Sequence, residues 1–393
     1  MTRLDEIADR YDALVVGARA AGAATALLLA RQGLSVLVVD RGRYGSDTLS
    51  TLALMRGGVL QLSRWGLAGR LRAAGTPAVT RTTFHYGGES LAVAIKPGDG
   101  VDALCAPRRT LLDSTLVDAA AAAGAVVFHE VRMTRLLRAA DGRVDGAELE
   151  TAGGVPRRVH AGIVIGADGV RSRVARLAGA RETRVGRHAS GVVYGFWEGL
   201  ADDGYHWHYV PGAAAGVIPT NGGATLVFAA VARARFLDEL RRDLAAGHRR
   251  VLEQVSPALA AAVGRARRLE SLHGFPGEAG YLRRAWGPGW ALVGDASHFK
   301  DPITAHGLTD ALRDAELLAR AVAAGTDTAL AAYEAHRDEL SIPLHEISDA
   351  VAGYDWTLEG VQTLHRQLSA AMKREVEALL ALDTAPAAAA AGA

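Results

Sequence analysis

The first forty residues contain two short apolar runs on either side of an alanine-rich segment. DALVV (12–16) and SVLVV (35–39) have the length and β-branched content of buried strands, whereas AATALLLARQ (23–32) has the composition of a helix. Gly33 follows the helical segment and is expected to cap it. The pattern therefore predicts a β-α-β unit whose second strand ends at Asp40.

Further along the chain, the apolar pattern alternates between helical and strand periods. A helical pattern covers residues 49–75, and TRTTFHYGGESLAVAI (80–95) predicts a β-hairpin around Gly87-Gly88. Another helix is predicted over APRRTLLDSTLVDAAAAAGA (106–125), and a buried strand over GIVIGA (162–167). These elements continue the α/β pattern of the N-terminal unit.

A region of different pattern separates two α/β portions. From residue 188 to residue 231, short alternating segments indicate an antiparallel sheet, and residues 328–382 are expected to be wholly helical. The predicted fold class is α/β with an α+β insertion. It comprises a Rossmann-like nucleotide-binding domain of non-contiguous segments, an inserted antiparallel-sheet substrate domain and a helical C-terminus.

The expected boundaries divide the chain into four parts. They are a nucleotide-binding domain (1–80, 101–185 and 271–335), a substrate domain (81–100 and 186–270), C-terminal helices (336–383) and a disordered tail (384–393).

Composition limits the classes of partner. Among 393 residues, 44 Lys and Arg balance 43 Asp and Glu, so no overall positive field attracts nucleic acid. The single cysteine, Cys105, suits a reducing compartment, and the N-terminus lacks the apolar core of a signal peptide. The longest uncharged stretch, residues 204–232, is interrupted by prolines and glycines, which argues against a membrane span. We therefore expect a cytoplasmic protein with no nucleic-acid partner and no membrane span.

The turn after the first strand reads GARAAG (17–22). A dinucleotide fingerprint has three glycines, and here Gly17 and Gly22 hold the first and third places while Arg19 holds the second. Asp40 lies 23 residues after Gly17, where an acidic residue receives ribose hydroxyls. The Arg19 side chain must either point away from the phosphates or contact them.

Two later stretches have the same strand-to-turn character. GADGVRSRVARL (166–177) places Asp168-Gly169 after a buried strand, although Asp-Gly is by itself a common turn. GDASHFKDPITAHG (294–307) places Gly294-Asp295 after the apolar WALV and is longer than ordinary strand–helix connections. Its Gly307 lets the next helix present its first N–H groups, which favour negative charge.

Together the three stretches resemble the signatures of the single-component FAD-dependent aromatic hydroxylases, the para-hydroxybenzoate hydroxylase-like flavoprotein monooxygenases. RGRYGSDTLST (41–51) and APRRTLLDSTLVDAA (106–120) are similar to FAD-associated segments of this superfamily, and the resemblance covers roughly residues 12–330. It implies bound FAD, in contact with Arg108 or, preferably, Arg109. The full set of implied FAD contacts is Gly17, Arg19, Ala20, Ala21, Gly22, Asp40, Arg41, Arg109, Asp168, Gly294, Asp295, Pro302, Gly307 and Leu308.

The resemblance also implies the reaction. NAD(P)H would bind transiently and reduce the flavin, which would capture O2 as a C4a-hydroperoxide and hydroxylate or epoxidise an apolar cyclic substrate, aromatic or polyketide-like. No metal is needed, and the protein would be a monomer or a homodimer. His306 departs from the family pattern, and it is either a substrate or proton contact or a neutral hydrogen-bonding replacement.

Substrate contacts are expected on the inserted sheet. In YHWHY (205–209), alternation places His206 and His208 on one face and the aromatic residues on the other, so the face toward the flavin is either titratable or aromatic. Alternatively, neither face meets the flavin, and one face of the strand belongs to the core while the other faces solvent. The candidate catalytic residues are His206, His208, Tyr209, Tyr194 and His306.

The sequence leaves three other functions open. A flavin-dependent reductase of isoprenoid double bonds, of the geranylgeranyl reductase type, has the same motifs without oxygen chemistry. A flavin-dependent halogenase would carry a W-x-W-x-x-I-P element, and the nearest match, GVIPT (216–220), has no tryptophan pair. The third is a non-catalytic binding module that has lost its flavin, because Arg19 replaces the middle glycine of the fingerprint.

Overall fold

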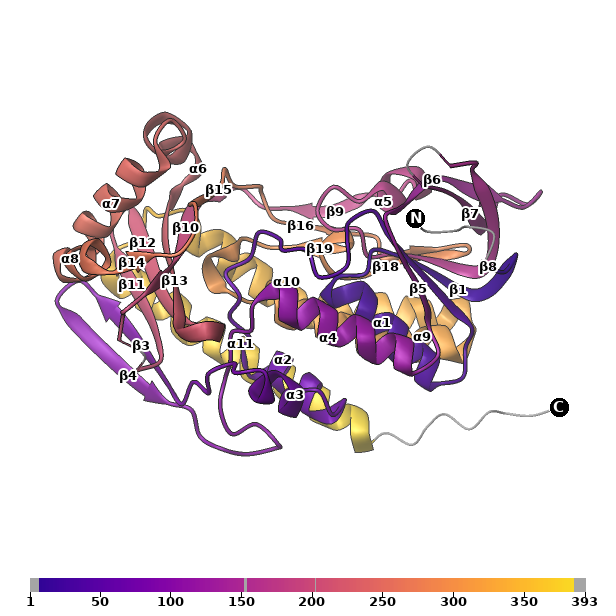
Figure 1. Cartoon of the computed structure of the whole chain (residues 1–393), viewed down its shortest axis with the longest axis horizontal. Coiled ribbons are helices and arrows are strands. Elements are labelled where there is room, and N and C mark those ends of the chain that lie inside the picture. Colours follow the sequence, from indigo (N-terminus) through magenta and orange to yellow (C-terminus); the bar gives the residue numbers. More distant parts are fainter. Residues whose placement is uncertain (1–6, 152–153, 202, 385–393) are drawn as a thin grey trace.

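The computed structural model describes residues 7–151, 154–201 and 203–384, and its first sheet is mainly parallel (Figure 1). The sheet has the order β17-β18-β8-β1-β2-β5, and all neighbours after β18 are parallel. The hairpin β6–β7 extends it, because β7 pairs with the first half of β8. Its strands are β1 (Arg10–Val16), β2 (Val36–Asp40), β5 (Val126–His129), β6 (Val131–Arg138), β7 (Val144–Thr151), β8 (Arg157–Gly166), β17 (Trp286–Gly287) and β18 (Trp290–Leu292).

Alternation along β1 divides the core into two layers. Ala13 and Val15 face the largest apolar cluster, which includes the helices α1 (Ala20–Arg31), α4 (Arg109–Ala122) and α9 (Gly307–Ala324). Leu14 and Val16 face the other side, where β6, β7 and the short helix α5 (Arg173–Ala178) cover the sheet. Because both faces of its second half are buried, residues 13–16 of β1 are continuously apolar.

A second sheet lies beside the first (Figure 1). Its order is β14-β10-β13-β12-β11-β3-β4, with β15 on β10, and every pair is antiparallel except β11 with β3. One face packs on α7 (Leu244–Val255) and α8 (Pro257–Arg265), and the other joins the largest apolar cluster. The strands are β3 (Arg81–Tyr86), β4 (Glu89–Ala94), β10 (Ser190–Glu198), β11 (Tyr205–Val210), β12 (Ala213–Pro219), β13 (Ala224–Ala232), β14 (Arg267–Arg268) and β15 (His273–Phe275).

The remaining elements connect the two sheets. A three-stranded sheet consists of β19 (His298–Phe299), β16 (Tyr281–Arg283) and β9 (Glu182–Val185). The long helix α11 (Leu358–Thr384) starts near the second sheet and packs against α2 (Arg56–Arg64) and α10 (Asp327–Val351) (Figure 1). The short elements are α3 (Ala68–Ala73), α6 (Arg233–Arg235), η2 (Asn221–Gly223), η3 (Phe236–Leu240), η4 (Gly294–Ala296) and η5 (Pro302–Thr304).

The predicted fold class is confirmed, and two predicted helical regions differ in extent. The helix expected over 49–75 is two helices that begin only at Arg56, because Leu54 bridges to Cys105 and Gly66 has φ 78°. The helical C-terminal region is interrupted between α10 and α11. Helix α11 continues through Thr384, and residues 385–393 of the expected tail lie outside the described residues.

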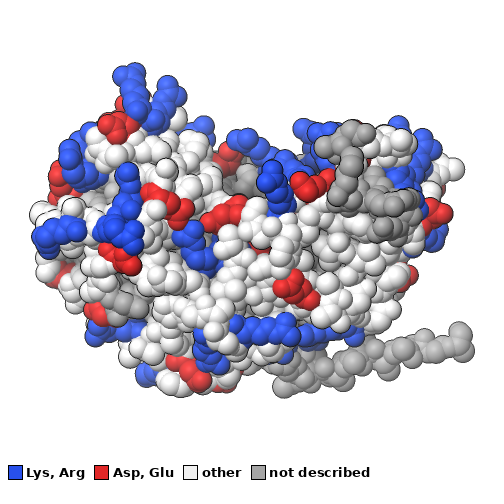
Figure 2. Space-filling view, viewed as in Figure 1, with Lys and Arg blue, Asp and Glu red and all other residues white. Residues whose placement is uncertain are grey.

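The surface agrees with the balanced composition. On the face shown in Figure 2, basic and acidic side chains are interspersed around the rim. Within the described residues, no helix is both long enough and apolar enough to cross a bilayer.

We expect α11 to be an integral part of the core. Leu379 of α11 is 0% exposed within the largest apolar cluster, so Leu379→Ala should lower the free energy of unfolding by about 2–5 kcal/mol. Urea denaturation measures this loss. The exposed Lys373 on the same helix provides the control, Lys373→Ala, which should change stability by less than about 0.5 kcal/mol. Equal effects of the two substitutions would contradict this role.

Candidate functional site

The turn between β1 and α1 contains two glycines that no larger residue can replace without displacing neighbouring backbone atoms. Gly17 has φ 109°, and a Cβ at this position would lie 2.3 Å from the carbonyl oxygen of Ala167, at the end of β8. A Cβ on Gly22 would lie 1.8 Å from the carbonyl oxygen of Gly17. Close packing of strand, turn and helix therefore explains why the first and third positions of the fingerprint are glycine.

Asp40 ties this turn to the end of β2. Its Oδ2 accepts the N–H of Ala18 at 2.7 Å, and its Oδ1 accepts the N–H of Gly42 at 2.6 Å. Arg41 between them is exposed. The carboxylate thus lies beside the turn, as the fingerprint predicts, while its contact with a ribose stays a prediction.

The structure places the Arg19 side chain away from the start of α1. Its guanidinium pairs with Asp113 of α4 at 3.1 Å and donates to the carbonyl oxygens of Ser46 and Asp47. Arg109 is buried and pairs with the same Asp113 at 3.0 Å. The side chain of Arg19, at the middle position of the fingerprint, is therefore directed toward the loop after β2.

A surface hollow lies next to these residues. It joins the β1–α1 turn, the end of β2 and the first half of α4. Tyr44 and His129 also border it, and their rings meet edge to face, which the sequence did not indicate. The residues that line the hollow are Ala18, Arg19, Asp40, Arg43, Tyr44, Gly45, Ser46, Asp113, Ser114, Val117 and His129.

Gly294 and Asp295, which follow β18, lie against the start of α1. Gly294 has φ 60°, and a Cβ there would lie 2.7 Å from the Cβ of Ala21. Asp295 follows, and no hydrogen bond of the described residues reaches its carboxylate. Burial raises the pKa of Asp295 to about 6, and the nearby charge of Arg109 opposes this shift. An acidic group with unused acceptors therefore lies where α1 and η4 meet.

The first turn of α9 faces open space. Gly307 is exposed, and no atom lies within 4 Å of the position that a Cβ would take. Among the described residues, no side chain caps α9 or α1. Because the first N–H groups of an uncapped helix attract anions, both helix starts are suited to negatively charged groups. Ala20, Ala21 and Leu308 contribute to these two starts.

Asp168 and Pro302 have local structural roles. Asp168 accepts the hydroxyl of Ser172 at 2.5 Å and the N–H of Arg173 at 2.6 Å, so it holds the start of α5. Pro302 opens η5, and Asp301 before it accepts the N–H of Ser190 on β10 at 2.6 Å. Contact of Asp168 or Pro302 with a cofactor stays a prediction.

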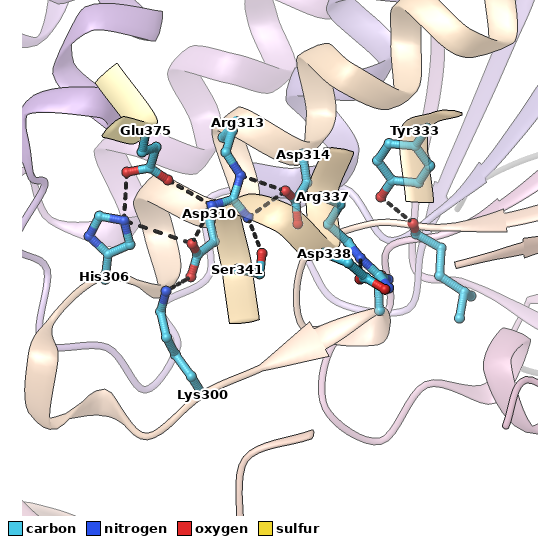
Figure 3. Close-up of polar contacts among 12 residues, drawn as sticks. Lys300, His306, Asp310, Arg313, Asp314, Tyr333, Arg337, Asp338, Ser341 and Glu375 are labelled. Atoms are coloured by element: carbon cyan, nitrogen blue, oxygen red, sulfur yellow. Dashed lines mark hydrogen bonds and ion pairs between the residues drawn. The ribbon is translucent and has the colours of Figure 1, made fainter. Parts of the chain in front are cut away.

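His306 belongs to a buried ionic network behind the start of α9 (Figure 3). Its Nε2 lies 2.8 Å from Glu375 of α11. Arg313 pairs with Glu375 and with Asp314, each at 2.7 Å, and Lys300 pairs with Asp310 at 2.5 Å. The sequence could not indicate Glu375, which is 69 residues from its partner.

The second sheet presents an aromatic face to the apolar cluster that also contains α1, α4 and α9. Tyr205, Trp207 and Tyr209 are buried in the largest apolar cluster, together with Tyr194 of β10. The Tyr194 hydroxyl accepts the N–H of Ser50 at 3.2 Å. The aromatic face of β11 is therefore the buried one, and its contact with a flavin or a substrate stays a prediction.

His206 and His208 lie on the opposite face of the second sheet, which is the face covered by α7 and α8. His206 contacts Asp203 at 2.6 Å and His85 at 3.0 Å, and the rings of His85 and His208 stack at 4.1 Å. Burial lowers the pKa of His208 to about 3. The expectation that His206 or His208 acts as the catalytic base is not supported, because neither residue faces the cofactor-binding elements.

The implied FAD fits these residues. The glycine-closed turn leaves the start of α1 uncapped for a pyrophosphate, and Asp40 and Asp295 offer carboxylates on either side of it. The uncapped start of α9 lies close by, because η4 packs on both α1 and α9.

The raised pKa of Asp295 leads to a prediction about pH. Its ordinary value is 3.8, so above pH 6 the folded protein holds an ionised, half-buried carboxylate, which destabilises it by about 3 kcal/mol at most. This destabilisation disappears below about pH 4, where Asp295 is protonated in both the folded and the unfolded state. Asp295→Asn should therefore stabilise the FAD-free protein at pH 8 but not at pH 4, and should weaken FAD retention. Urea denaturation and flavin release measure both effects, and equal stabilisation at both pH values would contradict the assignment.

Comparisons with known proteins agree with the implied FAD. Residues 10–342 match the family model described as FAD binding domain. Digeranylgeranylglycerophospholipid reductase 1 of Methanococcoides burtonii is 27% identical over 326 residues, which cover 80% of this chain and 75% of that protein. Menaquinone reductase of Mycolicibacterium smegmatis is 28% identical over 339 residues, which cover 80% of this chain and 77% of that protein.

Solved structures share the fold over most of the chain. PqsL, described as a probable FAD-dependent monooxygenase from Pseudomonas aeruginosa, has a TM-score of 0.76 at 23% identity and covers 91% of this chain and 100% of its own. The flavin-dependent brominase Bmp2 has a TM-score of 0.77 at 20% identity and covers 93% of both chains. Since the family model spans most of the sequence, the chain belongs to the FAD-binding-domain family and is an FAD-dependent oxidoreductase.

Proposed function

We propose that the protein is an FAD-dependent monooxygenase that uses NAD(P)H and O2 to hydroxylate or epoxidise an apolar cyclic small molecule, aromatic or polyketide-like. The observation that carries this proposal is the buried aromatic face of the second sheet, which is directed toward the FAD-binding elements. Flat aromatic side chains offer large apolar contact areas to cyclic ligands. A cytoplasmic location belongs to the same proposal.

Each FAD-binding residue has a specific task in this proposal. The start of α1 after Gly17 would hold the pyrophosphate, Asp40 the ribose and Asp295 the ribityl chain. The start of α9 at Gly307 would hold the pyrimidine edge of the flavin. When bound, FAD supplies hydride acceptance from NAD(P)H and activation of O2, and the protein supplies orientation and a dry environment.

Residues of the second sheet would position the substrate. Tyr194, Trp207 and Tyr209 are each 4% exposed, so the face they form excludes water. Burial raises the pKa of Tyr194, so its hydroxyl stays protonated at neutral pH and can donate a hydrogen bond. This chemistry suits an apolar ring that carries a polar substituent.

Reduction of isoprenoid double bonds is the second candidate function. The observation in its favour is the similarity to proteins named as reductases over 80% of this chain. Halogenation has less support, because AAAGVIP (213–219) lacks the tryptophan pair expected before Ile-Pro. The two leading functions differ in their use of O2.

Oxygen consumption separates these functions. The FAD-loaded protein is mixed with NADH or NADPH and with phenols, indoles or polyketide-like aromatics, in an oxygen electrode. We expect a substrate of this class to accelerate NAD(P)H oxidation with equal consumption of O2, and labelled O2 to enter the product. Substrate-dependent NAD(P)H oxidation that proceeds without O2, with a saturated isoprenoid product, would instead establish the reductase.

Tyr194 provides a test of the substrate face. Its hydroxyl holds the N–H of Ser50, in the segment that leads to Met55 and, through the Met55 N–H, to Thr309 of α9. Tyr194→Phe removes the hydroxyl that would donate to the substrate, so binding should weaken by about 0.5–1.5 kcal/mol and the KM for the organic substrate should rise by about 2- to 10-fold. His208→Ala, on the opposite face of the sheet, is the matched control and should leave KM unchanged. A larger effect of His208→Ala would place the substrate on the other face.

A further inference from the structure

Three histidines lie together on one face of the second sheet, outside the candidate FAD site. His206 and His208 alternate along β11, and parallel pairing makes His85 of β3 the register partner of His208. One ring nitrogen from each of the three residues lies within 4.8 Å of the other two. Since successive side chains of a strand point to opposite faces, all three rings lie on the face away from the aromatic residues of β11.

Hydrogen bonds orient two of these rings toward each other. Nδ1 of His85 meets the hydroxyl of Ser90 on β4 at 2.8 Å, and Nε2 of His206 meets Oδ1 of Asp203 at 2.6 Å. The remaining nitrogens, Nε2 of His85 and Nδ1 of His206, face each other at 3.0 Å. Each imidazole thus has a hydrogen-bonded partner on one nitrogen and turns the other nitrogen inward, which is the arrangement of histidines that bind metal ions.

Asp203 determines which nitrogen of His206 is available. The hydrogen bond from His206 lowers the pKa of Asp203, so the carboxylate is ionised and can only accept. The proton of this contact is therefore on Nε2 of His206, and in the neutral imidazole Nδ1 holds the lone pair that faces His85. The second carboxylate oxygen pairs with Arg81 at 2.8 Å, which holds Asp203 in place.

His208 supplies the third nitrogen, and its ring has to turn to do so. The rings of His208 and His85 stack at 4.1 Å with 10° between their planes, and no hydrogen bond among the described residues holds His208. A tetrahedral zinc ion with Zn–N bonds of about 2.0–2.1 Å places its ligand nitrogens about 3.3 Å apart. Rotation about χ2, which has broad minima in histidine, brings the third nitrogen into this range. Burial lowers the pKa of His208 to about 3 and also lowers that of His85, so both rings are in the neutral form that binds metals.

An ion can reach these nitrogens from solvent. All three rings are only half-buried, and the side chains of His206 and Asp203 are 19% and 48% exposed. Strand β4, which lies next to β3 at the edge of the sheet, is exposed along its whole length. The group is therefore open on the side of the β3–β4 hairpin.

One other group of the described residues has ligand atoms this close together. It consists of His306, Asp310 and Glu375, and all three are buried. Its carboxylates already pair with cations of the protein, Asp310 with Lys300 at 2.5 Å and Glu375 with Arg313 at 2.7 Å. The histidines of the second sheet have no such cation on the nitrogens that face inward, so they are the better metal ligands.

We propose that His85, His206 and His208 form a binding site for a divalent transition-metal ion such as Zn²⁺, with the fourth position open to water. Imidazole nitrogens suit Zn²⁺, Ni²⁺ and Cu²⁺, and three histidines with one open position are a known zinc arrangement. The ion joins β3 to β11 across 121 residues of chain and so fixes the β3–β4 hairpin to the second sheet. It takes no part in the proposed flavin reaction, because it lies on the face of the sheet away from the candidate FAD site.

The test measures Zn²⁺ binding by the full chain with bound FAD, purified without a histidine tag and freed of metals with EDTA. Isothermal titration calorimetry with ZnCl₂ should show saturable binding of one ion per chain. His85→Ala removes the nitrogen that faces His206 and should abolish this binding. Asp203→Ala keeps all three imidazoles but removes the group that orients His206, so it should weaken Zn²⁺ binding by about 10- to 100-fold.

His160→Ala is the matched control, because His160 is an exposed imidazole of the first sheet that lies 3.4 Å from a carboxylate, that of Asp145. It should leave Zn²⁺ binding unchanged. The KM comparison with His208→Ala uses the same metal-free protein, so the ion does not enter it. Wild-type protein that binds no Zn²⁺ would overturn the inference, and so would binding that persists in His85→Ala or that weakens equally in His160→Ala. If His85→Ala does not retain FAD, Asp203→Ala decides alone, and unchanged affinity in that variant would overturn the site.

Discussion

The candidate site depends on close backbone packing where three strands of the first sheet end. The turn after β1 touches the residue that follows β8, through Gly17 and Ala167, and Gly294 after β18 touches Ala21 at the start of α1. Side chains at these glycines would separate the elements by several tenths of an ångström or more. Because the contacts are this close, two helix starts and two carboxylates meet in one small region, which is the requirement for holding an extended dinucleotide.

Charge is arranged differently at the two helix starts. Near α1, Asp113 shares its carboxylate between Arg19 and Arg109, so the cations are held by a partner on α4. Near α9, the ionic groups are fully buried behind the helix start and are held by α11. The first arrangement leaves a surface hollow beside the β1–α1 turn. The second makes α11 part of the candidate site.

Local features of the site were predictable from the sequence, but its long-range contacts were not. Gly17, Gly22, Asp40 and Asp295 could be singled out because each lies at or just beyond the end of a strand, at a position with a known geometric requirement. The direction of the Arg19 side chain depends on Asp113, 94 residues away, and a local pattern contains no information on such a pair. The face of β11 that meets the first domain was also undetermined, because period-2 alternation defines two faces without saying which one is covered.

Helix α11 joins the two halves of the molecule at two points. His365 meets the hydroxyl of Tyr86 on the second sheet at 2.8 Å, and Glu375 meets His306 at the start of α9. During synthesis on the ribosome, residues 294–314 emerge before this helix is made. Until Glu375 arrives, Arg313 and His306 lack one of their carboxylate partners, so the final assembly of this region must wait for translation of α11.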